Sequence, residues 1–500
     1  MLGKKKFQPK LMYNLTIDDL VPEDNIYRQI DQFLDLRFVY KECEKLYGKT
    51  GKPSIDPVVF FKLELYGYFE NIISDRELIR KVSDSLAARY FVGYDIDEKL
   101  PWHSTISRTR GLISKETFEN IFSKILELCY QTGLIAGKHQ SIDSTLVEAN
   151  ASLESVERKE PKLTVEEYIN KTYELNKEEQ SLKEDDEAKI NEDHRSELRI
   201  EGSTEKSQKK KGESNQNYES KTDSDSKMVS KPGKPSGLYY STHYSADSKT
   251  RIITDVLTTY ADRRDSEVLL EVYDRAEKRL DKFGLAIEEI SADKGYCSGR
   301  NLREFERRNI RAYIPTKEYV NTSENINSRE FSFDEVKHVF ICPNQKELFF
   351  TAYEKQKQRN RYRAKHKDCL ECPLKARCCP KGKSRSVSQT IYYKEYQRLD
   401  KKLQTPAGRR ASRIRKVVSE GLFAEGKMYH GLRKFMTRGI DKAQKRSYMI
   451  ASVQNLKRLL MDMKRKLRIA VQKVADILVE PFSLNKFMFV LIPKNNDWVN

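Results

Sequence analysis

Apolar side chains recur at helical spacing along the first 135 residues of the chain. The run VVFFKLELYGYF has Pro57 in its first turn and follows Ser54, which we expect to cap the helix. In DRELIRKVSDSLAARYFVG, five apolar side chains fall on one stripe of a helix that ends at Gly93: Leu78, Ile79, Val82, Leu86 and Ala87. Ser104 is predicted to cap a short helix, and SKETFENIFSKILELCYQTGLI to form a long one. These periods predict an all-helical domain over residues 1–135.

Beyond this domain, short apolar runs of strand length alternate with helical segments. KHQSIDSTLVEAN, residues 138–150, is predicted to be the first strand, and GLYYSTHYSADSKTRIITDVLTTY to be a hairpin around the turn DSKT. A helix is expected from Asp265 to Gly284, then the strand IEEISADKGY, the helix SGRNLREFERRNI and the strand RAYIPT. His243, in the hairpin, is more typical of packing or hydrogen bonding than of a ligand. This order predicts a mixed α/β sheet with helices packed on it.

Two segments interrupt the core pattern. Residues 151–232 are rich in Glu, Lys, Ser and Asp and poor in apolar residues, so we expect a solvated insertion that is helical first and then disordered. Residues 335–385 carry most of the cysteines. The predicted order is an N-terminal helical domain (1–135), the first core strand (136–150), the charged insertion (151–232), the continued core (233–334), the cysteine segment (335–385), a basic helical region that completes the core (386–470) and a C-terminal tail (471–500).

Composition narrows the class of partner. The formal net charge of +18 over 500 residues favours a polyanion, with nucleic acid ahead of an anionic membrane surface. No apolar run approaches the roughly 18 residues that a spanning helix needs, and no apolar segment follows the basic N-terminus as in a signal peptide. We therefore expect a soluble, cytoplasmic protein with no membrane partner.

Two aspartates lie in the predicted sheet. Asp143 stands inside the strand SIDSTL, where an aspartate is disfavoured and costly to bury alone. Asp293 ends the strand EEISADKGY, and open α/β sheets bind ligands at the carboxyl ends of their strands. Two such carboxylates would repel each other, and Mg²⁺ or Mn²⁺ would remove the conflict. For either residue alone, a strand-end aspartate bonded to backbone amides is the simpler explanation.

A third acid lies in the predicted helix SRIRKVVSEGLFAEGKMYHG. At 3.6 residues per turn, Lys416, Glu420 and Lys427 share one face, whereas Glu425 lies well around the helix and is the weaker candidate. The shared face fits a surface ladder of ion pairs, each worth roughly a few tenths of a kcal/mol. It fits a metal-binding glutamate between two phosphate-binding lysines equally well, and spacing leaves both interpretations open.

The cysteines suggest a second kind of metal site. Cys369, Cys372 and Cys378 lie in DCLECPLKARCCP, with Cys379 adjacent and Cys342 upstream in FICPNQ. A C-x₂-C-x₅-C spacing with one distant cysteine, Cys342, is sufficient for a tetrahedral, structural Zn²⁺ site. Reduced, partly buried thiols are the alternative, and we put zinc ahead of it.

Basic residues mark the candidate DNA contacts. Arginine and lysine recur at nearly every turn from Arg409 to Arg468, which indicates contacts with a phosphate backbone. The short N-terminal helix is also basic, and it fits a helix-turn-helix reader or an ordinary bundle with solvated arginines equally well. The candidate DNA-binding residues are Arg108, Arg110, Lys416 and Lys427.

Three blocks resemble, in the same order, the catalytic blocks of DDE transposases of bacterial insertion sequences: SIDSTLVEANAS, SADKGYCSGRNLREFERRNIRAYIPTK and VVSEGLFAEGKMYHGLRKFMTRG. Residues 54–113 resemble the helical domain that precedes the core in one large group of these enzymes, and the cysteine cluster is similar too. The resemblance implies a ribonuclease H-like core in which Asp143, Asp293 and Glu420 hold Mg²⁺ or Mn²⁺, two ions in all. Family members often carry Tyr, Arg and Lys around the glutamate, where this chain has Arg413, Lys416 and Lys427, so only the lysine is kept.

The resemblance implies a transposase that binds the terminal inverted repeats of its element and target DNA. Such an enzyme cuts and rejoins DNA without a covalent protein–DNA intermediate, and a dimer on two synapsed ends is plausible. Two alternatives stay open: a non-enzymatic DNA-binding protein with a zinc module, such as an inactive transposase descendant, and a ribonuclease H-like nuclease that cleaves without strand transfer.

Overall fold

A computed structural model describes residues 15–48, 54–159, 215–316 and 326–477, apart from residues 216, 232 and 234. Most of the predicted charged insertion and the end of the C-terminal tail lie outside the described residues. Among the helices described, none is both long and apolar enough to cross a membrane.

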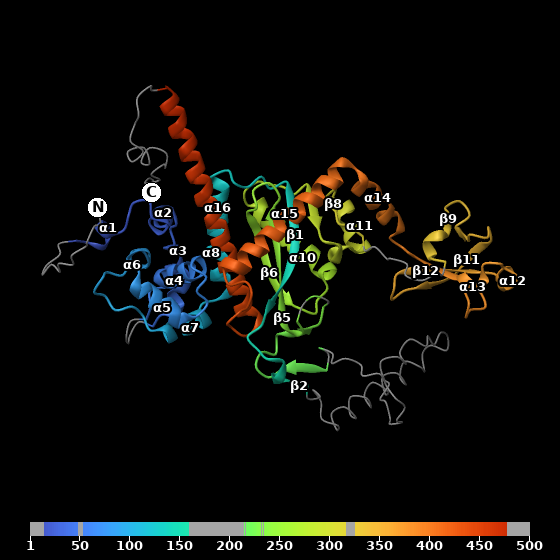
Figure 1. The fold of residues 1–500 in the computed structure, drawn as a ribbon, viewed down its shortest axis with the longest axis horizontal. Helices are drawn as coiled ribbons and strands as arrows, with labels where there is room; N and C mark the ends of the chain where they lie inside the picture. Colours follow the sequence, from blue (N-terminus) through green and yellow to red (C-terminus); the bar gives the residue numbers. More distant parts are fainter. Residues whose placement is uncertain are drawn as a thin grey trace, which may run out of the picture.

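The N-terminal part is helical throughout the described residues, as the periodicity predicts (Figure 1). Its helices are α1 (Ile17–Leu20), α2 (Ile26–Phe33), α3 (Phe38–Cys43), α4 (Pro57–Phe69), α5 (Asp75–Asp84), α6 (Leu86–Val92), α7 (His103–Leu112) and α8 (Lys115–Gln131), with a 3₁₀ turn, η1 (Glu44–Leu46). Helix α4 is buried on nearly every side, which explains why its sequence is apolar without a polar face.

Three details of the predicted helices are wrong. Helix α4 is capped by Asp56, whose carboxylate accepts from the Val58 and Val59 amides, and not by Ser54. Helix α7 begins after Trp102 and has no side-chain cap, so Ser104 lies inside it. The predicted long helix that ends at Gly93 is two helices, α5 and α6. The chain is extended at Ser85, whose hydroxyl caps α6, and this break turns Leu86 out of the core.

The core sheet is mixed, as the sequence predicts, and its strands have the order β4-β5-β1-β7-β8, with β6 also paired to β5. Its strands are β1 (His139–Glu148), β4 (Lys227–Val229), β5 (Gly237–Asp247), β6 (Ile253–Tyr260), β7 (Glu289–Ala292) and β8 (Arg311–Tyr313). Strands β1, β7 and β8 run parallel, whereas β4, β5 and β6 are antiparallel to their neighbours. This connectivity is the ribonuclease H-like arrangement, so the predicted fold class is confirmed.

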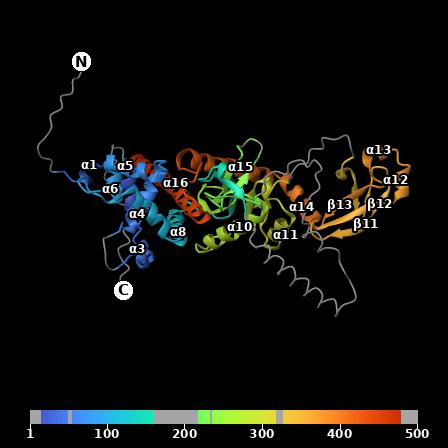
Figure 2. The ribbon, with the colours of Figure 1, turned by 90° about the horizontal axis from the view of Figure 1, so that it is seen from below.

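Helices cover both faces of the sheet, as Figure 2 shows, with α10 on one side and α15 on the other. The core helices are α10 (Asp265–Asp281), α11 (Gly299–Arg307), α14 (Tyr393–Gln404), α15 (Pro406–Tyr429) and α16 (Ile440–Ile477). The predicted basic helical region is thus real, and it forms three helices.

Helix α16 joins the N-terminal helices to the sheet, packing on α8 and on strand β6 (Figure 1). Two buried amide side chains of α16 bond the backbone of β6. Asn455 accepts from the Ile253 N–H and donates to its carbonyl, both at 2.8 Å. Gln444 accepts from the Thr258 N–H and donates to the Val256 carbonyl. The outer edge of β6 is therefore satisfied by side chains in place of another strand.

The cysteine segment is a second, antiparallel sheet of order β13-β12-β11-β10-β9 with its own small apolar core. It comprises β9 (Ser332–Asp334), β10 (Val339–Ile341), β11 (Glu347–Glu354), β12 (Arg359–Ala364) and β13 (Ser386–Thr390), with α12 (His366–Leu370) and α13 (Lys375–Cys378). The segment therefore begins and ends slightly outside residues 335–385.

The base of the charged insertion is ordered. Strands β2 (Val156–Arg158) and β3 (Tyr218–Ser220) pair with each other, and the Lys159 amide donates to the Asn217 carbonyl at 2.8 Å. The described residues before and after the insertion therefore lie side by side. The folded core resumes well before residue 233.

Candidate active site

The pairing of β1 with β7 brings the two predicted aspartates side by side. The strands are parallel, with Ile142 opposite Ala292 as the last pair in register. Asp143 and Asp293 each follow one of these residues, so they occupy the next matching positions at the same edge of the sheet. Strand β1 continues through Asp143, whereas the chain leaves β7 at Asp293 for the 3₁₀ turn η4 (Lys294–Tyr296).

An arginine from helix α15 spans the two carboxylates. Arg415 Nη1 donates to Asp143 Oδ2 at 2.8 Å, and Arg415 Nη2 lies 3.7 Å from Asp293 Oδ1. The Arg415 side chain is 12% exposed, so it lies on the inner face of the helix. Because one guanidinium contacts both acids, the pair is close enough to share a single cation.

The environment of Asp143 is unfavourable for a negative charge. Burial raises the pKa of Asp143 to about 6, against the hydrogen bond from the Ser144 amide and the charge of Arg415, while Asp293 and Asp265 raise it further. A site that gathers several carboxylates in a half-buried place favours bound positive charge. Hard carboxylate oxygens suit Mg²⁺ or Mn²⁺, so Asp143 and Asp293 fit the metal that the sequence predicts.

Glu420 does not join the aspartates. It lies on the exposed side of α15, five residues after Arg415 and about 140° around the helix from it. It makes no hydrogen bond or ion pair with any described residue. Across the described chain, no group of three or more His, Cys, Asp or Glu side chains is arranged to hold a metal ion. The structure therefore assembles two of the three predicted acids.

Glu425, the weaker candidate, is engaged elsewhere. Its carboxylate bonds Arg458 and lies 3.5 Å from His430 and 3.8 Å from Lys457. Burial opposes its charge, but Arg458 and His430 hold the pKa of Glu425 down to about 2. It serves as a link from α15 to α16 and is not available to the aspartates.

The structure adds residues that sequence reasoning missed. Ser144 Oγ donates to Asp265 Oδ1 at 3.0 Å, which brings the first residue of α10 to the active-site strand. The sequence pattern indicates Asp265 only as the start of a helix. The signal that could have found it is its place directly after the hairpin, because the helix that follows β6 must begin near the same edge of the sheet as Asp143.

His243 is a buried hydrogen-bonding residue, as predicted. Its Nδ1 is 2.7 Å from the Tyr296 hydroxyl and its Nε2 is 3.2 Å from Thr259 Oγ1. Burial lowers the pKa of His243 to about 3, so the ring is neutral. It anchors Tyr296, the last residue of η4, to the middle of the sheet.

One predicted DNA-binding residue is placed wrongly by the sequence. Arg110 is only 4% exposed, and its guanidinium pairs with Glu64 and Asp75 inside the N-terminal domain. It lies on the inner side of α7, whereas Arg108 is exposed. A buried arginine that two carboxylates hold cannot contact a phosphate, so Arg110 is a structural ion pair. Of the two lysines beside Glu420, Lys416 is exposed and Lys427 is half-buried.

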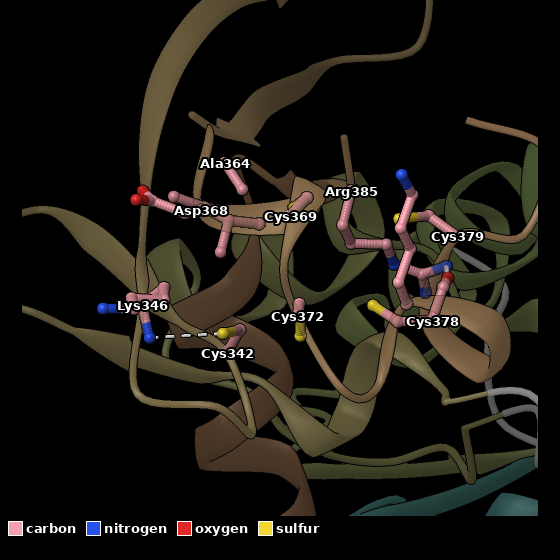
Figure 3. A pocket seen from close by; sticks show the side chains of 11 residues that line it. Cys342, Lys346, Ala364, Asp368, Cys369, Cys372, Cys378, Cys379 and Arg385 are labelled. Atoms are coloured by element: carbon pink, nitrogen blue, oxygen red, sulfur yellow. Dashed lines mark hydrogen bonds between the residues drawn. The ribbon is translucent and has the colours of Figure 1, made fainter. Parts of the chain in front are cut away.

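The cysteines gather around one pocket of the second sheet (Figure 3). The four predicted ligands, Cys342, Cys369, Cys372 and Cys378, all line it, together with Cys379. The Lys346 amide donates to Cys342 Sγ at 3.2 Å, and Asn344 donates to Cys372 Sγ at 3.5 Å. Burial raises the pKa of Cys378 to about 11. The thiols thus share one place, although they are not drawn into a ligand set, and zinc stays a prediction.

Two family models match the chain. The first, "Transposase domain (DUF772)", covers residues 15–112, the helical N-terminal part. The second, "Transposase DDE domain", covers residues 341–460, from the cysteine segment through Glu420 into α16. No curated protein matches the chain. The two matched regions lie on either side of the ribonuclease H-like strands that carry Asp143 and Asp293. Both matched regions are similar to transposase domains, and together they support an insertion-sequence DDE transposase.

Proposed function

We propose that the protein is a transposase that binds the ends of an insertion sequence and catalyses metal-dependent cleavage and strand transfer of DNA. The observation that carries the proposal is the register of β1 and β7, which sets Asp143 beside Asp293. The similarity to a transposase DDE domain makes DNA the expected partner, and the sustained positive charge of the chain agrees with a polyanion.

Asp143 and Asp293 are the residues that would hold Mg²⁺ or Mn²⁺, and Glu420 would complete the set. When bound, the metal supplies activation of an oxygen nucleophile and stabilisation of the leaving oxygen at phosphorus. Arg415 keeps the two aspartates together until then, because it neutralises both. Glu420 makes no bond with another described residue that would have to break. A rotation of α15 or a change of the Glu420 side-chain conformation could therefore bring its carboxylate to the two aspartates. Two DNA ends brought together would call for a dimer on DNA.

Arg108, Lys416 and Lys427 are proposed to contact DNA phosphates. Arg108 and Lys416 are exposed, and Lys416 lies one turn before Glu420 on the outer face of α15. A lysine at this place would contact the backbone of the strand whose phosphate reaches the aspartates. Such contacts add affinity that falls steeply with salt.

The test is cleavage and strand transfer by the purified full-length protein on a duplex that carries the inverted repeats flanking its gene. We expect Mg²⁺-dependent nicking at the repeat ends followed by joining to a second DNA. Asp143→Asn and Asp293→Asn should abolish both steps and leave DNA binding intact, whereas Asp262→Asn, which changes an exposed aspartate of the β6–α10 loop, should behave as wild type.

Each other outcome favours a different class. Cleavage without joining would indicate a nuclease, and binding without cleavage would indicate an inactive descendant. Full activity in Asp293→Asn would overturn the assignment of the active site.

We also propose that the cysteine pocket holds a structural Zn²⁺ through Cys342, Cys369, Cys372 and Cys378. The support is that all four cysteines line one pocket, although Cys342 follows β10, Cys369 lies in α12, Cys372 follows α12 and Cys378 ends α13. Metal analysis of protein purified without chelator should find one zinc per chain. Cys369→Ser should lose it, whereas Cys43→Ser, which changes a buried cysteine of the helical domain, should keep it. Zinc-free protein whose cysteine-segment thiols all titrate in the folded state would contradict the proposal.

A further inference from the structure

We propose that Asp265 is a positioning residue of the active site, which sets Asp143 through Ser144 and Asp293 through the turn at Gly295. The proposal rests on the proposed function and deepens it, since the residues it positions are the proposed metal-binding aspartates.

The first contact is made through strand β1. Helices α10 and α15 cover opposite faces of the sheet (Figure 2). Neighbouring residues of a strand point to opposite faces, and Asp143 bonds Arg415 of α15 whereas Ser144 bonds Asp265 of α10. Ser144 Oγ donates to Asp265 Oδ1 at 3.0 Å. The Ser144 amide donates at 2.8 Å to Asp143 Oδ1, the carboxylate oxygen that Arg415 does not bond. Asp265 therefore fixes the residue whose backbone orients the Asp143 carboxylate.

The second contact is made with the turn after β7. A Cβ atom on Gly295 would lie 2.7 Å from Asp265 Oδ2, which is closer than real side chains allow. The carboxylate thus rests directly against the backbone two residues after Asp293. A side chain at position 295 would push the Asp265 carboxylate away, so the glycine of ADKGY keeps this close contact possible.

The start of α10 is itself held against the turn. Asn301 is buried, and its Nδ2 donates to the Ser266 carbonyl at 2.8 Å and to the Tyr296 carbonyl at 3.2 Å. Tyr296 is anchored in the sheet by His243. Asp265 is consequently placed from both sides, and it joins the end of β7 to the middle of β1 at the point where both aspartates project.

A positioning role differs from direct metal binding in one testable respect. As an acceptor of the Ser144 hydrogen bond, the carboxylate can be replaced by the amide of asparagine, which keeps the oxygen and the shape. If the Asp265 carboxylate bound the metal directly, its negative charge would be needed, and asparagine would not replace it. The location on the α10 side of the sheet, opposite Arg415, favours the positioning role.

The test measures Mn²⁺ affinity of the full-length protein by titration and cleavage of the repeat-end duplex as separate kcat and KM. Asp265→Ala should weaken Mn²⁺ binding or lower kcat by about 10- to 100-fold with KM for DNA unchanged, as for other residues that orient metal ligands. Asp265→Asn should recover most of the loss. Ser144→Ala should act in the same direction, and the double variant Ser144→Ala/Asp265→Ala should be no worse than Asp265→Ala, because both changes remove one contact.

Asp262→Ala removes an exposed carboxylate from the same loop and should match wild type. Thermal unfolding and DNA binding establish that each variant folds. Wild-type Mn²⁺ affinity and kcat in a folded Asp265→Ala protein would overturn the positioning role, as would an Asp265→Asn protein as impaired as Asp265→Ala, which would indicate a direct ligand. A different result would show that the proposed function itself has failed. In that case the wild-type protein does not cleave DNA, and Asp143→Asn binds Mn²⁺ as well as wild type does.

Discussion

At the scale of single residues, burial decides which charged side chains can take part in function. Arg108 and Arg110 are two residues apart in one short helix, and composition cannot separate them. Arg108 is exposed, whereas Arg110 lies inside the domain between Glu64 and Asp75. One is available to DNA and the other holds the domain together.

Arg110→Ala should lower the free energy of unfolding by about 3–5 kcal/mol, because buried Glu64 and half-buried Asp75 lose the cation that they share. Arg108→Ala should leave stability unchanged and weaken DNA binding, with a smaller salt dependence than wild type. Urea unfolding and binding titrations at several salt concentrations measure both effects. Equal stabilities of the two variants would contradict the buried ion pair.

The acids show the same dependence on surroundings. Asp143 and Asp293 could be selected from the sequence because each stands at an unusual place in a strand and because their blocks resemble the catalytic blocks of the family. Asp265 could not, because its role depends on how α10 packs against Ser144 and Gly295. Glu425 and Glu420 look alike in sequence, yet ion pairs to α16 occupy the first and leave the second exposed.

At the scale of elements, helix α15 carries both the guanidinium that joins the two aspartates and Glu420, the acid proposed to complete the metal-binding set. Arg415 lies on its inner face and Glu420 on its outer flank. The periodicity of this helix was predictable, but its rotation about its own axis was not. That rotation follows from packing on β1 and β7, to which the helix sequence gives no direct clue.

Arg415→Gln should destabilise the metal-free protein by about 1–3 kcal/mol, because a charged hydrogen bond to Asp143 is lost and two carboxylates are left facing each other. Mg²⁺ should recover more stability in the variant than in wild type, since the ion no longer competes with the guanidinium. Thermal unfolding with and without Mg²⁺ measures this difference. Arg413→Gln, on the exposed side of α15, is the matched control. An identical response to Mg²⁺ in Arg415→Gln and wild type would contradict the competition.

Element boundaries were less predictable than element types. The break at Ser85 and the cap at Asp56 depend on single backbone conformations, which helical periodicity does not report. The order of β1, β5, β6, α10, β7, α11 and β8 was predictable, because each run had the length and apolar pattern of its own element. Strands β2, β3 and β4 were not, because they lie in the segment whose composition indicates a solvated insertion.

At the scale of the whole molecule, α16 connects the parts. It packs on α8 of the N-terminal domain and completes β6 of the catalytic sheet through Gln444 and Asn455. A long basic helix was predictable, but its function as the partner of a sheet edge was not, because the two polar residues resemble any others on a solvated helix. The N-terminal helices and the catalytic sheet thus share one structural member.

The parallel register of β1 and β7 has a consequence for how the gene can change. The two aspartates are separated by 150 positions in the chain, and the paired ribbon of β2 and β3 brings the ends of the charged segment together whatever its length. Lengthening or shortening that segment should therefore cost little. A deletion of one residue within β7, by contrast, would turn Asp293 to the other face of the sheet. Insertions and deletions in related sequences should accordingly be common between the codons of Asp143 and Asp293. They should be absent from the few codons next to that of Asp293.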